Sequence, residues 1–389
     1  MAYLIYMEHD WILYLAAFAS AFGIALATTP FAKKMAFKFN AVQYPRDRDM
    51  HNKPMPRMGG IAIVLGFTIT TTIMAILVPY FRSPEFAGFA IGGIIITVMG
   101  VLDDIVGLKS LTKLVIQLAV AVIIVSFGIR IEILVWPFTT YLEEISIPVT
   151  IFWIVGMTNA VNLIDGLDGL AAGVSSIGAL CVMVLCILSG SPLAVVMAAT
   201  LAGSCIGFLP RNFNPAEVFM GDTGALFIGY VLAVSSVLGV FKGYTLLAIL
   251  VVIFALSLPI FDTVFAFFRR LYKGRSVTAW MDADRGHMHH RLIDAGFSHK
   301  QSVVLLYAVS LLTAIIAIVI AVQDIRAIFI TVIFLLALVT VLYVYRKRTD
   351  RSNKELTIKS VDTTGTIETT SEETEKETET DGENQKPQM

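Results

Sequence analysis

The chain has 389 residues, of which 56 % are hydrophobic and only 15 % are charged, and its formal net charge at pH 7 is -1. An ordinary soluble domain has about 25 % charged residues, so this composition excludes that class. We expect a lipid bilayer around the chain and no nucleic-acid partner. The three cysteines lie inside apolar runs, which argues against a disulfide framework.

Long apolar runs recur along the chain, and several reach the length of about 20 residues that a helix needs to cross a bilayer. We therefore predict an all-α, polytopic integral membrane protein, a bundle of about 11 transmembrane helices. The predicted spans are 11–29, 60–80, 86–101, 111–130, 147–158, 169–189, 192–209, 224–241, 244–268, 302–322 and 325–345. The spans 86–101 and 147–158 are shorter than usual, which tilting or shielding by neighbouring helices would explain.

The distribution of lysine and arginine predicts the orientation. These residues concentrate in loops after odd-numbered spans, whereas loops after even-numbered spans carry only Arg82, Arg130, Lys242 and Arg326. Because cytoplasmic loops are rich in basic residues, we place the N-terminus outside and the C-terminus in the cytoplasm of a multi-pass cell-membrane protein. Residues 349–389 are rich in Thr, Glu and Ser and predict a disordered acidic cytoplasmic tail behind a membrane-embedded domain at 1–348.

Polar stretches interrupt the apolar sequence, and the predicted topology brings them all to the cytoplasmic face. They are VLDDIVGL at 101–108, NAVNLIDGLDGLAAG at 159–173, FMGDTGALF at 219–227 and the histidine loop DRGHMHHRL at 284–292. The adjacent Asp103 and Asp104 either lie in a solvated loop or have a function, since acidic residues at a membrane edge tend to be functional. A divalent cation beside them would remove their repulsion.

The second stretch spaces Asn162, Asp165 and Asp168 three residues apart, so a helix would place them roughly on one face. Gly166 and Gly169 favour a helix end or a broken turn instead. Asp168 alone is explained equally well as the N-cap of the next span.

In the third stretch, Asp222 or Thr223 is predicted to cap the span that follows. A helix start attracts phosphate, but a carboxylate there repels it unless a cation mediates. Hard oxygen ligands of this kind suit Mg²⁺, which normally keeps waters and binds substrate phosphates.

The histidine loop contains His287, His289 and His290 between Arg285 and Arg291. Zinc is a poor candidate because no cysteine is near and the arginines would repel it. Arginine and histidine donors match phosphate oxygens better, with hydrogen bonding at a loop corner as the alternative. A carboxylate-rich Mg²⁺ site beside an anion clamp indicates phosphoryl transfer. Because Walker A and kinase signatures are missing, ATP-dependent functions are disfavoured.

The stretches GVLDDIVGLKS, NAVNLIDGLDGLAAG, FMGDTGALFIGY and DRGHMHHRL resemble the polyprenyl-phosphate N-acetylhexosamine-1-phosphate transferase superfamily over about residues 11–348. PIFDTVFAFFRRLYKGRS and HMHHR look like its UDP-GlcNAc branch, and the acidic tail is similar to the type that begins wall teichoic acid linkage units. The resemblance implies transfer of GlcNAc-1-phosphate from UDP-GlcNAc to undecaprenyl phosphate, with release of UMP and with Mg²⁺, or Mn²⁺ in its place, as cofactor. A homodimer is one oligomeric state that fits.

The resemblance also implies roles for individual residues. The catalytic residues would be Asp103, Asp104, Asp222 and His290, and the metal ligands Asp222, Asn162 and Asp104. The substrate-binding residues would be Lys53, Asn159, Asn162, Asp165, Asp168, Phe219, Arg285, His287, His289 and Arg291. Around Lys53 the sequence departs from the family pattern.

In the family, the aspartate pair is assigned to activation of the lipid phosphate. A phosphate monoester has a second pKa near 6, so roughly nine-tenths of it is already dianionic at pH 7. We therefore expect Asp103 and Asp104 to hold Mg²⁺ or to position the nucleophile rather than to remove a proton. The alternatives for the whole chain are a phospho-MurNAc-pentapeptide transferase and, more remotely, a transporter of metal or sugar phosphate.

Overall fold

The computed structural model describes residues 2–44, 54–132, 134–135, 140–141, 143–239, 253, 256–272 and 292–322. The predicted span 325–345 and the predicted tail at 349–389 lie outside the described residues, as does most of 244–256. The described elements belong to one compact unit, Met1–Asp324.

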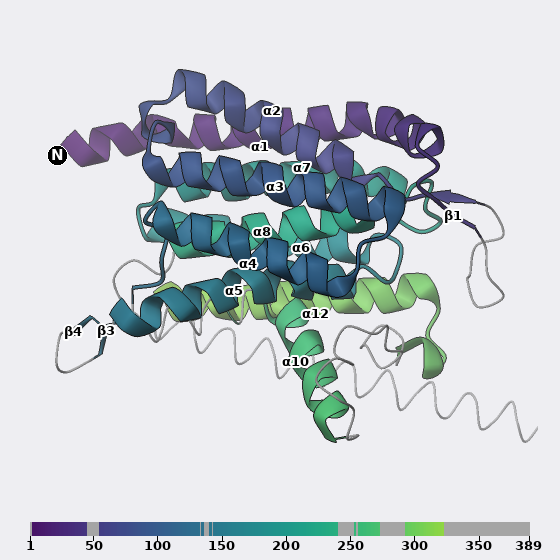
Figure 1. The fold of residues 1–389 in the computed structure, drawn as a ribbon. Coiled ribbons are helices and arrows are strands. Elements are labelled where there is room, and N and C mark those ends of the chain that lie inside the picture. Colours follow the sequence, from purple (N-terminus) through teal and green to yellow (C-terminus); the bar gives the residue numbers. More distant parts are fainter. Residues whose placement is uncertain are drawn as a thin grey trace, which may run out of the picture. The chain divides into compact units, whose positions relative to one another are not determined.

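The described chain is helical apart from two short antiparallel hairpins (Figure 1). The helices are α1 (Ala2–Lys38), α2 (Gly60–Leu77), η1 (Pro79–Phe81), α3 (Pro84–Val106), α4 (Ser110–Ser126), α5 (Glu143–Ile164), α6 (Leu170–Leu188), α7 (Pro192–Asn212), α8 (Gly221–Gly239), α10 (Ser257–Tyr272) and α12 (His299–Val322). The strands β1 (Val42–Gln43) and β2 (Met55–Pro56) pair with each other, as do β3 (Leu134–Val135) and β4 (Thr140–Tyr141).

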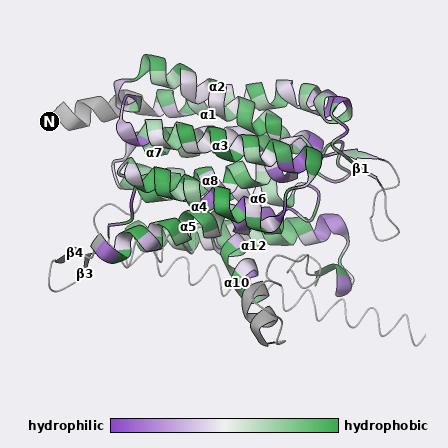
Figure 2. Ribbon diagram, in the orientation of Figure 1, coloured by the Kyte–Doolittle hydropathy of each residue, from purple (hydrophilic) through white to green (hydrophobic). Residues whose placement is uncertain are grey.

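In the described part of the chain, eight helices are long and apolar enough to cross a membrane, and α4 is a shorter apolar helix. Each predicted span up to residue 241, and the span 302–322, coincides with a helix, so the polytopic helical architecture is confirmed. The short bounds of two spans were wrong: α3 has 23 residues and α5 has 22. The prediction stopped where polar residues begin, whereas both helices continue through them. Figure 2 shows hydrophobic residues along the middles of the helices and hydrophilic residues towards their ends.

Helix α8 lies at the centre of the bundle. It packs against α2, α3, α5, α6 and α7, while α1 packs on α7 and α2, and α12 packs on α6. Every residue of α8 is buried except Asp222, in its first turn. A helix that is buried all round by protein needs no lipid-facing stripe, and its polar start is held by neighbouring helices rather than by water.

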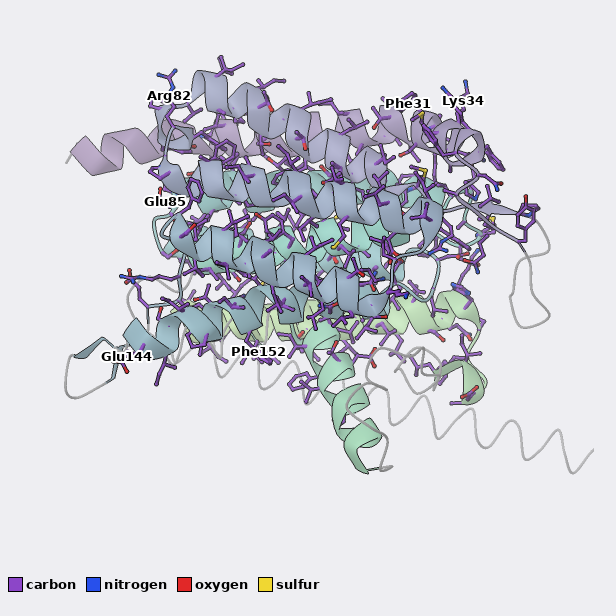
Figure 3. All side chains as sticks on the ribbon, in the orientation of Figure 1. Phe31, Lys34, Arg82, Glu85, Glu144 and Phe152 are labelled. Carbon is purple, nitrogen blue, oxygen red and sulfur yellow. The ribbon has the colours of Figure 1, made fainter. Side chains whose placement is uncertain are left out.

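The helix ends that carry the polar stretches lie at the same end of the bundle. The last turn of α3 contacts the first turn of α8, and the last turn of α5 does the same. Lys34 lies at one end of the bundle, and Arg82 and Glu85 lie at the opposite end (Figure 3). The predicted convergence is therefore confirmed for the three described stretches. Assignment of this end to the cytoplasm stays a prediction.

Cysteine labelling will test the orientation, since Lys34 and Arg82 are exposed and the native cysteines are buried. We expect a membrane-impermeant maleimide to label Arg82→Cys in intact cells and to label Lys34→Cys only after the cells are opened. The unsubstituted protein is the control and should stay unlabelled in both conditions. The opposite labelling pattern would reverse the predicted topology.

Candidate active site

The start of α8 is capped by a carboxylate from another helix. Asp104, in the last turn of α3, accepts the N–H of Asp222 at 2.9 Å, and the N–H and hydroxyl of Thr223 at 3.0 and 2.6 Å. The first amides of a helix have no partner within it, and a negative charge there is favoured by the helix dipole. The prediction that Asp222 or Thr223 caps this helix was wrong, because the cap comes from α3.

Gly221 allows this close packing. Its φ is +71°, a conformation that side chains disfavour, and an added Cβ would lie 1.8 Å from the carbonyl oxygen of Arg57 and 2.6 Å from an oxygen of Asp104. The segment before α2 is paired with the residues before α8: the Phe219 N–H donates to the Pro56 carbonyl at 2.8 Å. The loop around Arg57 is thereby fixed beside the start of α8.

A lysine joins two of the aspartates. Lys113, in the first turn of α4, donates to Oδ2 of Asp103 at 2.7 Å and to Oδ2 of Asp222 at 2.9 Å. The other oxygen of Asp103 accepts the Leu108 N–H at 2.6 Å, and that of Asp222 accepts Nδ2 of Asn162 at 3.0 Å. The solvated-loop interpretation of Asp103 and Asp104 was wrong, since both are buried within α3.

Asp165 follows the end of α5, in the turn that the two glycines predicted. Burial raises the pKa of Asp165 to about 7, and the negative charges of Asp222 and Asp104 add to this effect. The nearby guanidinium of Arg57 opposes it. Among the described residues, Arg57 makes no ion pair.

Asp168 is buried and braces three segments. Its Oδ2 accepts Nδ2 of Asn214 at 3.0 Å and the Ala216 N–H at 3.1 Å, and its own N–H donates to Nε2 of His299 at 2.9 Å. The N-cap of α6 is Gly169, without a side-chain hydrogen bond, so the alternative that Asp168 caps this helix was wrong. Asp168 ties the turn after α5 to the loop before α8 and to the start of α12.

The remaining predicted residues divide into two groups. Asn159 lies one turn before Asn162 and pairs with Gln117, and the side chain of Phe219 is partly exposed beside the start of α8. The other predicted residues lie outside the described residues: Lys53, Arg285, His287, His289, His290 and Arg291.

Sequence reasoning missed Lys113, Arg57, Gln117 and His299. The sequence did indicate Lys113 and Gln117, since both are polar residues inside an apolar span. Such residues are energetically costly to place in a membrane and tend to be functional. Lys113 belongs to the basic residues that the topology assigns to loops after odd-numbered spans, although it lies within the predicted span 111–130. Arg57 and His299 carry no local signal, because their positions depend on how distant segments pair.

The donor set of the cluster fits Mg²⁺. Within the described ranges, no group of three or more His, Cys, Asp or Glu side chains is arranged to hold a metal ion unaided. Mg²⁺ does not require such a cage, because it usually takes one or two carboxylates and completes its shell with water and substrate phosphate. Asp222 has hard carboxylate oxygens, and Asn162 carries an amide oxygen besides the Nδ2 that donates to Asp222. The ammonium of Lys113 between Asp103 and Asp222 marks a position that favours a cation.

Comparison with known proteins gives consistent matches. Residues 86–240 match the model of glycosyl transferase family 4. The chain is 40 % identical over 316 residues to a probable undecaprenyl-phosphate N-acetylglucosaminyl 1-phosphate transferase of Bacillus subtilis, covering 80 % of this chain and 86 % of the relative. It is 35 % identical to a decaprenyl-phosphate N-acetylglucosaminephosphotransferase of Mycolicibacterium smegmatis, covering 73 % and 76 %. A phospho-N-acetylmuramoyl-pentapeptide-transferase of Staphylococcus aureus is 32 % identical, covering 58 % and 74 %.

Gly221→Ala will test the packing at the start of α8. We expect the left-handed conformation alone to cost about 1–3 kcal/mol, and the clash with the Arg57 carbonyl to displace Asp222 and abolish activity. Thermal unfolding in detergent and turnover measure the two effects. Gly156→Ala is the matched control, because a Cβ there meets no neighbour within 4 Å. Equal stability and turnover in the two variants would contradict the described geometry.

Proposed function

The chain belongs to the polyprenyl-phosphate N-acetylhexosamine-1-phosphate transferase superfamily, and on that basis we propose that it transfers GlcNAc-1-phosphate from UDP-GlcNAc to undecaprenyl phosphate. The observation that carries the proposal is the cluster in which Asp222 meets Lys113 and Asn162 at the end of the bundle. The Bacillus relative, whose name states this acceptor and this sugar, supports the choice of substrates.

The reaction is a displacement at phosphorus. An oxygen of the lipid phosphate forms a bond to the phosphorus that carries GlcNAc, the bond from that phosphorus to the UMP oxygen breaks, and UMP leaves with the electron pair. We favour one in-line step over a phospho-aspartyl intermediate, because two anionic substrates need alignment more than they need a protein nucleophile. The contacts of the carboxylates support this preference. Asp103 and Asp222 form ion pairs with Lys113, and Asp104 accepts hydrogen bonds from the start of α8, so none of the three is a free nucleophile.

We assign Mg²⁺, or Mn²⁺ in its place, to Asp222, Asn162 and Asp103. When bound, the ion would neutralise diphosphate charge and stabilise the leaving phosphate. Asp103 replaces Asp104 in the predicted ligand set, because Asp104 holds backbone amides of α8, whereas Asp103 and Asp222 share the Lys113 ammonium, whose position favours a cation. Asp104 then acts as a positioning residue, which keeps the backbone of Asp222 in place.

The anionic substrates need cations beside this acidic cluster. We propose that Arg57 contacts a phosphate from one side, since it lies near Asp165 without an ion pair in the described chain. Arginine suits this role because its fork of N–H donors matches phosphate oxygens. The predicted contacts of the histidine loop would supply donors from another side, and Phe219 with Asp165 and Asp168 would border the nucleotide.

The alternatives are less well supported. A transporter would need polar groups near the middle of the membrane, whereas the described aspartates of the cluster gather at one end of the helices. The muramoyl-pentapeptide relative covers a smaller share of this chain than the Bacillus relative does. We therefore favour UDP-GlcNAc as the donor, at the cytoplasmic face of the cell membrane, and place the product at the start of teichoic acid synthesis.

A transfer assay will test the proposed function. Membranes containing the chain, incubated with labelled UDP-GlcNAc and undecaprenyl phosphate, are expected to form lipid-linked GlcNAc and UMP. Chelation of divalent cations should stop the reaction, and added Mg²⁺ should restore it. UDP-MurNAc-pentapeptide in place of UDP-GlcNAc is the comparison substrate. Product from the pentapeptide donor alone would contradict the donor assignment, and activity that survives chelation would contradict the cofactor.

Asp103→Asn and Asp104→Asn will test whether either residue acts as a general base. We expect turnover to fall by about a hundredfold in each, because Lys113 or the start of α8 is displaced. Raising the pH to 9 should not restore it, since the lipid phosphate is already mostly dianionic at pH 7. The pH–rate profiles of both variants and of the unsubstituted protein measure this. Rescue at high pH would instead assign proton removal to the substituted residue.

A further inference from the structure

We propose that Gln117 and Asn159 form a positioning pair that sets the geometry of the site, and that Asn159 acts through this pair rather than by contacting substrate. The inference rests on the proposed function and replaces the predicted substrate contact of Asn159. It concerns a contact between the buried Gln117 of α4 and the half-buried Asn159 of α5, which lies next to the acidic cluster but shares no residue with it.

The two side chains bind each other through both of their amide groups. Asn159 Nδ2 donates to Gln117 Oε1 at 2.6 Å, and Gln117 Nε2 donates to Asn159 Oδ1 at 3.4 Å. Asn159 Nδ2 also donates to the Val155 carbonyl at 2.8 Å. Gln117 is 2 % exposed, so it has no access to a soluble ligand. Both protons of the Asn159 amide nitrogen are engaged, which leaves that nitrogen no donor for a substrate.

Helical spacing connects this pair to the site. Gln117 lies four residues after Lys113 on α4, and Asn159 lies three residues before Asn162 on α5. Residues at these separations share a face of a helix, so each partner lies one turn away from a residue that contacts Asp222. The pair thus joins α4 to α5 one helical turn away from Lys113 and Asn162, the residues through which the two helices contact the two oxygens of Asp222.

A reciprocal amide pair is a specific tie in this setting. In an apolar bundle, helices that are held by apolar contacts alone can slide or rotate slightly, whereas paired amides fix one register, because any other leaves the buried amide of Gln117 without a partner. Lys113 must meet two carboxylates from two helices at once. A shift of α4 against α5 of the order of 1 Å is enough to cost about a hundredfold in rate.

An exchange of the two side chains will test the pair. Gln117→Asn shortens it by one methylene, Asn159→Gln lengthens it by one, and the double variant restores the combined length. We expect each single variant to lower kcat by about tenfold or more with the KM for UDP-GlcNAc unchanged. The double variant should recover to within about threefold of the unsubstituted protein, as coupled neighbours do. Thermal unfolding of each purified variant gives a second readout, in which the double variant should also regain the stability lost in the single variants.

The controls distinguish a positioning role of the pair from a substrate contact and from a general loss of packing. Ser236→Ala removes a different tie of α5, the hydrogen bond that Trp153 donates to Ser236 of α8 at 3.1 Å, and should leave kcat unchanged. Gln117→Met keeps the side-chain length without its polar atoms and should also lower kcat. It provides a second test of the pair if Gln117→Asn folds poorly.

A raised KM in Asn159→Gln that persists in the double variant would make Asn159 a substrate contact. A double variant as slow as the slower single variant, or single variants with normal kcat, would also overturn the proposal. Activity of the unsubstituted protein on UDP-GlcNAc, in the same assay, tests the proposed function separately.

Discussion

The site depends on the ammonium of Lys113, which lies between Asp103 and Asp222. Carboxylates from α3 and α8 come together at the end of an apolar bundle, where solvation is poor and like charges repel strongly. One lysine from α4 offsets part of this repulsion and fixes the mutual positions of three helices. The negative charge of the two carboxylates, which makes the cluster suitable for a cation, therefore also determines how α3, α4 and α8 pack against one another.

The contacts at the start of α8 connect this cluster to the packing of the whole bundle. Asp104 satisfies the free amides of the helix from α3, and Gly221 lets the backbone of Arg57 approach the same point. Because the remainder of α8 is buried among other helices, its position cannot adjust without disturbing the bundle. The carboxylate of Asp222 is thus placed by the most constrained helix of the described structure, which suits a group that must be held in one geometry.

The helical architecture and the end of the bundle that carries the cluster could be predicted from the sequence, because hydropathy and the positions of polar stretches within it depend only on local composition. The three described polar stretches converge as expected. The caps of α8 and α6 could not be predicted, since a carboxylate from a distant helix supplied one and Gly169 the other. Lys113 was taken as a loop residue, because the rule that places basic residues at membrane edges does not distinguish a solvated lysine from one that faces carboxylates.

The charges of the described site also affect whether a diphosphate and a divalent cation bind separately or together. Asp103, Asp104, Asp165 and Asp222 face two nearby cations, Lys113 and Arg57, so the cluster is acidic unless protons are bound. A diphosphate alone is repelled by this excess, while a divalent cation alone is attracted and would relieve it. Under the proposed function each ligand would improve the binding of the other, and this coupling would be reciprocal by linkage. Among the described residues the carboxylates outnumber the cations, so the proposed reaction would be served better by a nucleotide that binds together with a divalent cation than by a free phosphate.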